Sequence, residues 1–306
     1  MESQTDKNKT ISIIIPFRDR LENVRECFIS VLHSEYKFIE VIAVDNASSK
    51  ETVGELTKEF VNNLRVKIVR SDVNLGAAGG RNLGVRYAQG DLLLFVDSDN
   101  VVDIKMVSNL VGFIEKNDDC GMVGPLMLYK NFPDMIWLYF ADINMCTSQA
   151  SYRGTGEKNE KQYAEVIETG HIPNCFLVWK NDFIKLGGFD EKYLIMYEEA
   201  DLAEKIKKDL KKKIIIYTKA VVYHNLEFLD KKNHCRLFLK SEERAYFISR
   251  NRIYFMRKHT SFFNFMRFVF IFLPLLTIYY EGVLCCSGKF KQAYYYLKGS
   301  IKGFLL

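Results

Sequence analysis

The sequence lacks the cysteine patterns of a zinc-binding or disulfide-rich protein. Its seven cysteines include no CxxC pair and follow no regular spacing, which argues against a zinc ribbon, and their odd number argues against a disulfide framework. We therefore expect reduced, mostly buried thiols. The N-terminus also lacks a basic start followed by a long apolar segment, so we expect neither a secretory signal nor an N-terminal anchor and place the chain in the cytosol. No internal repeat or low-complexity tract occurs, and 48% hydrophobic with 26% charged residues is typical of a globular protein.

Charge is distributed unevenly along the 306 residues. The net charge is +5, yet residues 230–306 hold 14 lysines and arginines against 4 aspartates and glutamates, whereas residues 1–229 hold 29 against 34. The same C-terminal stretch contains 18 of the 42 aromatic residues. This asymmetry predicts two regions that meet different partners.

The first 130 residues alternate between short β-branched runs and segments with helical spacing. This alternation predicts βαβ units, and hence an α/β fold with a mainly parallel sheet flanked by helices on both faces. Expected strands cover 11–16, 38–45, 65–70 and 91–97, and expected helices cover 21–34, 50–64, 78–89 and 104–117.

Three of these strands end in polar residues, at 16–19, 45–48 and 97–99. In an open parallel sheet, ligands bind beyond the carboxyl ends of the strands. We therefore expect the functional site at this edge of the sheet.

The pattern loosens after residue 121. We expect an exposed, mobile loop over 147–170, because that stretch has almost no core-forming residues. A second block follows, with an expected strand at 172–180, a short helix at 182–186, a helix at 198–210 and strands within 213–224.

Two carboxylates follow the buried strand LLLFV one residue apart. Asp97 and Asp99 are suited to a hard cation such as Mg²⁺ or Mn²⁺, which takes carboxylate and phosphate oxygens. The alternative is a turn that caps the next helix.

The stretch NLGAAGGRNLG, residues 74–84, places four glycines and Arg81 at the start of a helix. Exposed backbone N–H groups and a fixed cation suit a diphosphate. The alternative is a tight turn with close helix packing. The stretch is neither a Walker loop nor a GxGxxG that follows a strand.

The stretch YEEADL, residues 197–202, opens a helix with three acids in its first turn. Such acids suit the helix dipole, and one of them is a candidate general base. His224 ends a strand and is either a metal ligand or a structural histidine.

Taken together, these stretches resemble the family 2 glycosyltransferases with the GT-A fold, in particular the rhamnosyltransferase-like and galactofuranosyltransferase-like branch. The resemblance rests on SIIIPFRDR, VDNASS, NLGAAGGRNLG, DSD, GGFDE followed by YEEADL, and a later histidine, in that order over residues 10–258.

The resemblance implies a role for each candidate residue. It places Asp45 at the nucleotide base, Arg81 at the diphosphate and Glu199 as the general base. The sequence departs from the family in having glutamate where aspartate is commoner, so Glu198 and Asp201 remain alternatives for the base. The complete implied set is Pro16, Arg18, Asp45, Asn74, Gly76, Arg81 and Asp97 for the donor, Asp97, Asp99 and His224 for a divalent cation, and Glu198, Glu199 and Asp201 for catalysis.

The implied reaction is inverting transfer of a sugar from a nucleotide-diphosphate donor to an acceptor hydroxyl, assisted by Mg²⁺ or Mn²⁺. The domain boundaries that follow are a disordered N-terminus at 1–9, a nucleotide-sugar-binding half at 10–130, an acceptor and catalytic half at 131–229, and a helical region at 230–306. Rival functions are a nucleotidyltransferase and a non-catalytic protein that keeps the fold.

The C-terminal region combines basic and aromatic residues, as in 249–272, with an uncharged run at 268–280. Basic and aromatic residues together can bind single-stranded nucleic acid, but the adjacent apolar run favours an anionic membrane surface, and we expect no nucleic acid. We expect interfacial or re-entrant attachment on the cytoplasmic face, because 13 residues with a proline are short for a span. A single span is the second alternative, and a buried oligomer contact is the third. This location suggests a lipid-linked or cell-surface glycan acceptor.

Overall fold

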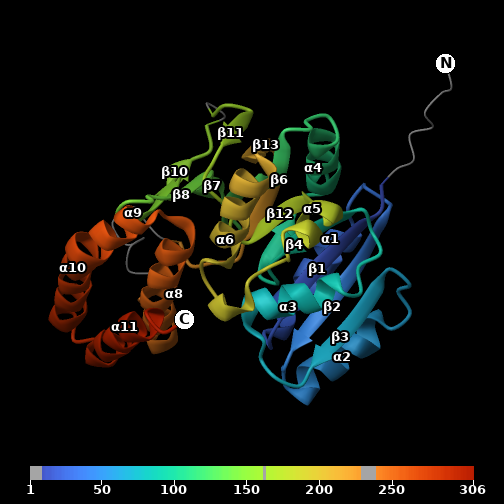
Figure 1. Cartoon of the computed structure of the whole chain (residues 1–306). Helices are drawn as coiled ribbons and strands as arrows, with labels where there is room; N and C mark the ends of the chain where they lie inside the picture. The colour runs from blue at the N-terminus through green and yellow to red at the C-terminus, as the bar shows by residue number, and fades with distance from the viewer. Residues whose placement is uncertain (1–8, 161–162, 229–238) are drawn as a thin grey trace.

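The computed structural model describes residues 9–160, 163–228 and 239–306. A large mixed sheet is flanked by helices, and the helices of the C-terminal region gather to one side of it (Figure 1). Apart from Lys9, the expected disordered segment 1–9 lies outside the described residues, as does the expected boundary at residue 230.

The N-terminal half confirms the predicted alternation of strands and helices. Four parallel strands stand in the order β4-β1-β2-β3, and β1 and β4 are apolar runs buried on both faces of the sheet. The elements are β1 (Ile11–Phe17), α1 (Leu21–Leu32), β2 (Ile39–Asn46), α2 (Lys50–Phe60), β3 (Val66–Ser71), α3 (Gly76–Val85), β4 (Leu92–Val96), β5 (Asn100–Val102) and α4 (Met106–Ile114).

The second half extends the same sheet. Strand β12 runs antiparallel between β4 and β6, while β13 runs parallel to β6 and antiparallel to β5, so that His224 pairs with Asn100. The elements are β6 (Cys120–Tyr129), β7 (Phe132–Leu138), β8 (Phe140–Ile143), β9 (Ala150–Arg153), β10 (Glu157–Lys158), β11 (Val166–Glu168), β12 (Cys175–Trp179), α5 (Lys180–Lys185), the 3₁₀ turn η1 (Glu191–Tyr193), α6 (Glu198–Lys205), the π turn η2 (Ile206–Leu210) and β13 (Lys213–His224).

The expected loop at 147–170 is partly strand. Strand β9 pairs with β8 in a separate two-stranded sheet, β10 pairs with β7, and β11 pairs with β13. These strands are two to four residues long and mostly exposed. Backbone pairing holds them, and because their side chains are mostly exposed they show no apolar alternation in the sequence.

The C-terminal region is helical: α8 (Glu242–His259), α9 (Phe262–Arg267), the π turn η3 (Phe268–Phe272), α10 (Leu273–Cys286) and α11 (Phe290–Gly303). Helix α11 packs closely on α8 through Gly299 and Gly303, where an added Cβ would stand 2.2 Å from the carbonyl oxygen of Tyr246 and 2.6 Å from that of Arg250. The expected 13-residue apolar run lies within one helical stretch of 25 residues, Phe262–Cys286, which is long and apolar enough to cross a membrane.

Pro274 lies inside this long helix, directly after the π turn η3, where the α-helical hydrogen-bond pattern is already interrupted. Of the cysteines in the described ranges, Cys27, Cys120 and Cys175 are buried, as expected, and Cys146 is half-buried. Cys285 and Cys286, at the end of α10, are exposed.

Candidate active site

The carboxyl ends of the parallel strands meet at one edge of the sheet. Pairing of β1 with β2 places Phe17 opposite Asp45, and pairing of β1 with β4 places Ile14 opposite Phe95, two residues before Asp97. The backbone N–H of Asp97 donates to the carbonyl oxygen of Asn174 (3.0 Å), which precedes β12. The polar strand ends therefore converge as the sequence predicts.

A buried arginine gathers three of the candidate carboxylates. Arg81, which is 1% exposed, donates from Nη2 to Asp97 Oδ1 (2.6 Å) and to Glu199 Oε1 (3.0 Å), and from Nη1 to Glu198 Oε1 (3.2 Å). Burial opposes the positive charge, but the three carboxylates hold the pKa of Arg81 above its usual value. The guanidinium therefore joins α3, the end of β4 and the start of α6.

These carboxyl groups differ in acidity. Burial raises the pKa of Asp97 to about 6, although the charge of Arg81 opposes the shift. Burial, reinforced by the negative charge of Glu199, raises the pKa of Glu198 to about 8. Glu198 Oε2 is buried and has no hydrogen-bond partner among the residues that the structure describes. Burial therefore disfavours the charged form of Glu198 relative to a solvent-exposed glutamate.

The glycine-rich stretch serves internal packing. Asn46 Oδ1 accepts from the N–H of Leu75 (2.7 Å), Asn74 Oδ1 accepts from that of Gly76 (3.0 Å), and the carbonyl oxygen of Leu194 accepts from that of Ala78 (3.2 Å). These amides have protein partners where the sequence predicts an open diphosphate site, and Arg81 faces carboxylates instead of solvent.

Two glycines explain why the sequence suggests that open site. Gly76 has a φ of 70°, and an added Cβ there would stand 2.4 Å from the carbonyl oxygen of Leu194. At Gly84 an added Cβ would stand 2.5 Å from Ile14 Cγ2 and 3.0 Å from Val44 Cγ2. A tight turn and close helix packing therefore account for both glycines.

The remaining donor candidates lie around the ends of β1 and β2. Asp45 is fully buried, accepts from the N–H of Ser48 (2.8 Å) and pairs with Arg70. Pro16 is half-buried at the end of β1, and Arg18 is exposed in the loop that follows.

Asp99 and His224 lie together at the ends of β4 and β13. Asp99 Oδ1 lies 3.4 Å from His224 Nε2, and this buried oxygen has no hydrogen-bond partner among the described residues. Burial disfavours the charged carboxylate, but the interactions with His224 and the charge of Arg20 hold the pKa of Asp99 below its usual value. The His224 ring packs edge-on against Trp137, with centroids 4.5 Å apart.

This pair has the chemistry of a partial cation site. An ionised, unsatisfied carboxylate oxygen beside an imidazole nitrogen suits Mg²⁺ or Mn²⁺, which can take its remaining ligands from phosphate and water. The third expected ligand, Asp97, is turned to Arg81. Across 9–160, 163–228 and 239–306, no group of three or more His, Cys, Asp or Glu side chains is spaced to hold a metal ion.

Asn174 is a site residue that the sequence analysis missed. It has a φ of 66°, its N–H donates to Glu199 Oε1 (3.3 Å), and its side-chain amide lies 3.3 Å from the His224 ring. It therefore links the acidic cluster to the Asp99 and His224 pair. An asparagine before an apolar strand is a local signal for such a left-handed position.

Asp201 stands apart from the other catalytic candidates. Its fully buried carboxylate accepts from Tyr193 Oη (3.2 Å) and interacts with His259 Nε2 (2.7 Å) and Lys258 Nζ (2.8 Å) on α8. Burial opposes ionisation, yet these partners lower the pKa of Asp201 to about 2. The structure thus turns this acid toward α8 and gives it structural partners.

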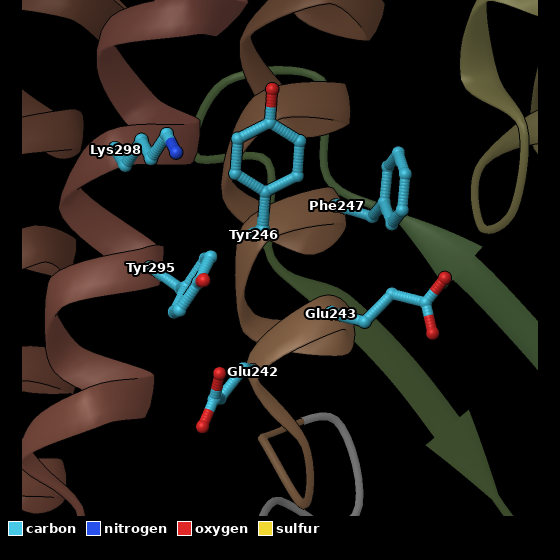
Figure 2. Close-up of a pocket in the computed structure, with 6 residues that line it drawn as sticks. All are labelled: Glu242, Glu243, Tyr246, Phe247, Tyr295 and Lys298. Carbon is cyan, nitrogen blue, oxygen red and sulfur yellow. The ribbon is translucent and has the colours of Figure 1, made fainter.

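A separate hollow is lined by residues of α8 and α11 (Figure 2). Its volume is about 430 Å³, and the described residues that line it are Glu242, Glu243, Tyr246, Phe247, Tyr295 and Lys298. None of these lining residues belongs to the predicted site.

A mainly parallel sheet flanked by helices, with carboxylates gathered beyond its strand ends, defines a GT-A-type α/β domain. The chain belongs to glycosyl transferase family 2, whose model matches residues 12–186.

Relatives agree with this assignment. Glycosyltransferase GlyG of Streptococcus pneumoniae is 26% identical over 143 residues, which are 46% of this chain and 47% of GlyG. The amylovoran biosynthesis glycosyltransferase AmsB of Erwinia amylovora is 23% identical over 225 residues, 71% of this chain and 70% of AmsB. The match to GlyG thus spans less than half the length of that relative.

The fold also resembles the solved structure of mannosyltransferase PcManGT from Pyrobaculum calidifontis in complex with GDP-Man and Mn²⁺. The TM-score is 0.59 with 14% identity, over 97% of this chain and 87% of that one. At this identity the likeness concerns the fold alone.

Proposed function

We propose that the protein is an inverting glycosyltransferase that moves a sugar from a nucleotide-diphosphate donor to an acceptor hydroxyl. The observation that carries the proposal is the cluster of Glu199, Arg81 and Asp97 beside Asp99 and His224 at the carboxyl edge of the sheet. In a family 2 chain, carboxylates at this edge support the proposal of a base and a cation-binding group where a donor would lie.

The donor diphosphate carries the charge that grows as the glycosidic bond breaks. Asp99 and His224 would hold a divalent cation, which would stabilise that charge as a Lewis acid. Two arginines lie within electrostatic range of Asp99: Arg20, exposed after β1, and Arg244, at the start of α8. We propose that these two cations meet the diphosphate in place of Arg81, whose charge is already compensated.

Glu199 takes the role of general base. Its carboxylate is held by Arg81 and the N–H of Asn174, and its side chain is 12% exposed against 4% for that of Glu198. Glu198 is the more buried of the two glutamates, and Asp201 faces α8. As the acceptor oxygen attacks the sugar carbon and the bond to the diphosphate breaks, the hydroxyl proton passes to Glu199.

Donor binding is the first experiment. The purified protein is titrated with UDP-, dTDP- and GDP-sugars, with and without Mn²⁺. The UDP- and dTDP-sugars include donors of galactofuranose and rhamnose, the sugars that the branch resembled by the motifs would transfer. Binding of one nucleotide class supports the proposal. If none of these donors binds, the result contradicts the proposal and favours a non-catalytic role.

The reaction product separates the two enzymatic alternatives. A glycosyltransferase releases a nucleoside diphosphate from the bound donor. A nucleotidyltransferase would instead release pyrophosphate when it is given a nucleoside triphosphate and a sugar phosphate. Release of pyrophosphate would overturn the transferase proposal in favour of this rival.

We also propose that the C-terminal helices attach the protein to the cytoplasmic face of a membrane. Only 22% of the apolar window within Phe262–Cys286 is buried, and Phe263, Phe270 and Ile278 are 82%, 75% and 70% exposed. The helix is long enough to cross a membrane, so its length fits a full span as well as the interfacial attachment that the sequence favours. Lys and Arg residues of the same region suit anionic headgroups.

A sedimentation assay tests this attachment. The intact protein should sediment with liposomes that contain anionic phospholipid and less with purely zwitterionic ones. Ile278→Glu should reduce the bound fraction, whereas Leu64→Glu, at a fully exposed position before β3, should not. Equal behaviour of the two variants would refute attachment through this helix. A membrane-bound transferase suggests a lipid-linked or cell-surface glycan as acceptor.

A further inference from the structure

Helix α8 reaches from the C-terminal bundle into the segment that precedes the catalytic acids. This segment, residues 193–197, leads directly into α6, whose first residues are Glu198 and Glu199. Leu194, Met196 and Tyr197 have φ values of 62°, 66° and 73°. A residue other than glycine with a positive φ is strained and persists only where the surroundings hold it.

One buried side chain binds most of this strained segment. Asn251, on α8, is fully buried, and its Nδ2 lies 2.9 Å from the carbonyl oxygen of Tyr193, 2.8 Å from that of Ile195 and 2.9 Å from that of Met196. An amide nitrogen has two N–H groups, so three acceptors share two donors. Asn251 thereby satisfies carbonyl groups that this conformation leaves outside regular secondary structure.

The neighbouring arginine fixes the direction of that amide. Arg250 Nε donates to Asn251 Oδ1 (2.9 Å), which turns the Nδ2 side toward the carbonyl groups. Arg250 Nη2 also donates to the carbonyl oxygen of Tyr193 (3.0 Å). Two consecutive residues of α8 therefore hold one short segment from the same side.

The held segment contacts both halves of the site. On one side, the carbonyl oxygen of Leu194 accepts from Ala78 at the start of α3, the helix that carries Arg81. On the other side, Tyr197 precedes Glu198 and Glu199, both of which bind Arg81. A shift of this segment would therefore move the acids relative to the arginine that orients them.

We infer that Asn251 is a positioning residue for the general base: by binding the carbonyl groups of Tyr193, Ile195 and Met196, it sets the start of α6 and hence the carboxylate of Glu199. The inference rests on the proposed transfer reaction. It gives α8 a role in catalysis that does not depend on membrane attachment.

The test compares two buried positions on α8. Asn251→Asp keeps the shape and removes both donors, and Asn251→Ser keeps one short donor in case the aspartate variant does not fold. Ser249→Ala is the matched control, because Ser249 Oγ donates to the carbonyl oxygen of Tyr296 on α11 (2.7 Å) and not to the held segment. Donor affinity, kcat for nucleoside diphosphate release and the thermal midpoint are measured for each full-length variant.

We expect Asn251→Asp or Asn251→Ser to lower kcat about tenfold or more, with donor Kd within about threefold of the wild-type value. Ser249→Ala should leave both constants near wild type. Amide hydrogen exchange in residues 194–200 should accelerate in the Asn251 variants alone. An unchanged kcat, or an equal loss of kcat in the Ser249 variant, would overturn the inference.

The design separates this inference from the proposed function. Hydrogen exchange requires no substrate, so unaltered exchange in residues 194–200 would refute the positioning contact even in an inactive protein. If the wild-type protein turns over no donor while exchange accelerates as expected, the transfer reaction fails and the structural contact stands.

Discussion

Glu198 and Glu199 are adjacent, and exchanging each for glutamine distinguishes their roles. Glu199→Gln keeps the side-chain shape and removes the carboxylate that we assign as general base. Glu198→Gln replaces a carboxyl group whose ionisation is disfavoured by burial with a neutral amide of similar shape. Both substitutions lie at the start of α6, but only Glu199→Gln removes the proposed general base.

The magnitudes follow from the contacts of Arg81. In Glu199→Gln, Asp97 still neutralises the guanidinium at 2.6 Å, so the main loss is that of the base, which is typically worth about 10²- to 10⁴-fold in rate, or roughly 3–5 kcal/mol. In Glu198→Gln, the amide oxygen can still accept from Arg81. We therefore expect a change in kcat below about tenfold and a stability cost of about 1 kcal/mol.

The assay measures acceptor-dependent release of nucleoside diphosphate, with donor affinity measured separately by calorimetry. Glu199→Gln should lose turnover while donor Kd stays within about threefold. If Glu198→Gln loses as much turnover as Glu199→Gln, the assignment of the base to Glu199 is refuted. A pH series gives a second readout: because the pKa of Glu198 is raised in the folded protein, its contribution to stability is complete below about pH 4.5 and is lost as pH rises through 8, so the difference in stability between the wild type and Glu198→Gln should change over this range.

Three further changes test the metal pair, the buried histidine and the helix packing. Asp99→Asn should weaken the Mn²⁺-dependent part of donor binding about tenfold or more; calorimetry with and without Mn²⁺ checks this, and an unchanged metal effect would remove Asp99 from the cation site. Burial lowers the pKa of His171 to about 3, so the contribution of His171 to stability is complete above pH 6.5 and falls by about 1.4 kcal/mol near pH 5.5. Urea unfolding near pH 7.5 and pH 5.5 should show this loss as a change in the difference between the wild type and His171→Gln; a difference that does not change with pH would contradict it. Gly84→Ala places a methyl group 2.5 Å from Ile14 Cγ2 and should lower the free energy of unfolding by about 1–3 kcal/mol, and a variant as stable as the wild type would show that α3 can move outward freely.

Local sequence patterns predict the sheet well but place its edge strands poorly. The runs ISIIIP and LLLFV are apolar because both faces of β1 and β4 are covered, and such runs can be read directly from the chain. Strands β9, β10 and β11 lack this signal because they are short and mostly exposed, and they are held by backbone pairing with β8, β7 and β13. Their existence depends on partners that the local sequence does not specify.

The same distinction applies to the site. The acids after β4 and at the start of α6 could be found as candidates from their residue types and spacing. Their partners could not, since Arg81 meets Glu198 across 117 positions of sequence and Asp201 meets His259 across 58. Spacing along the chain does not indicate which of three neighbouring acids faces the site.

The sequence by itself therefore determined the α/β class, the convergence of polar residues at one sheet edge, and the basic, aromatic character of the C-terminal region. Only the tertiary structure decided that Arg81 is a buried counterion, that Asp201 belongs to the contact with α8, and that Asn251 holds the segment before Glu199. The physical reason is the range of the interactions. Burial periodicity is local to each element, whereas the ionisation and orientation of a side chain depend on groups that folding brings from distant parts of the chain.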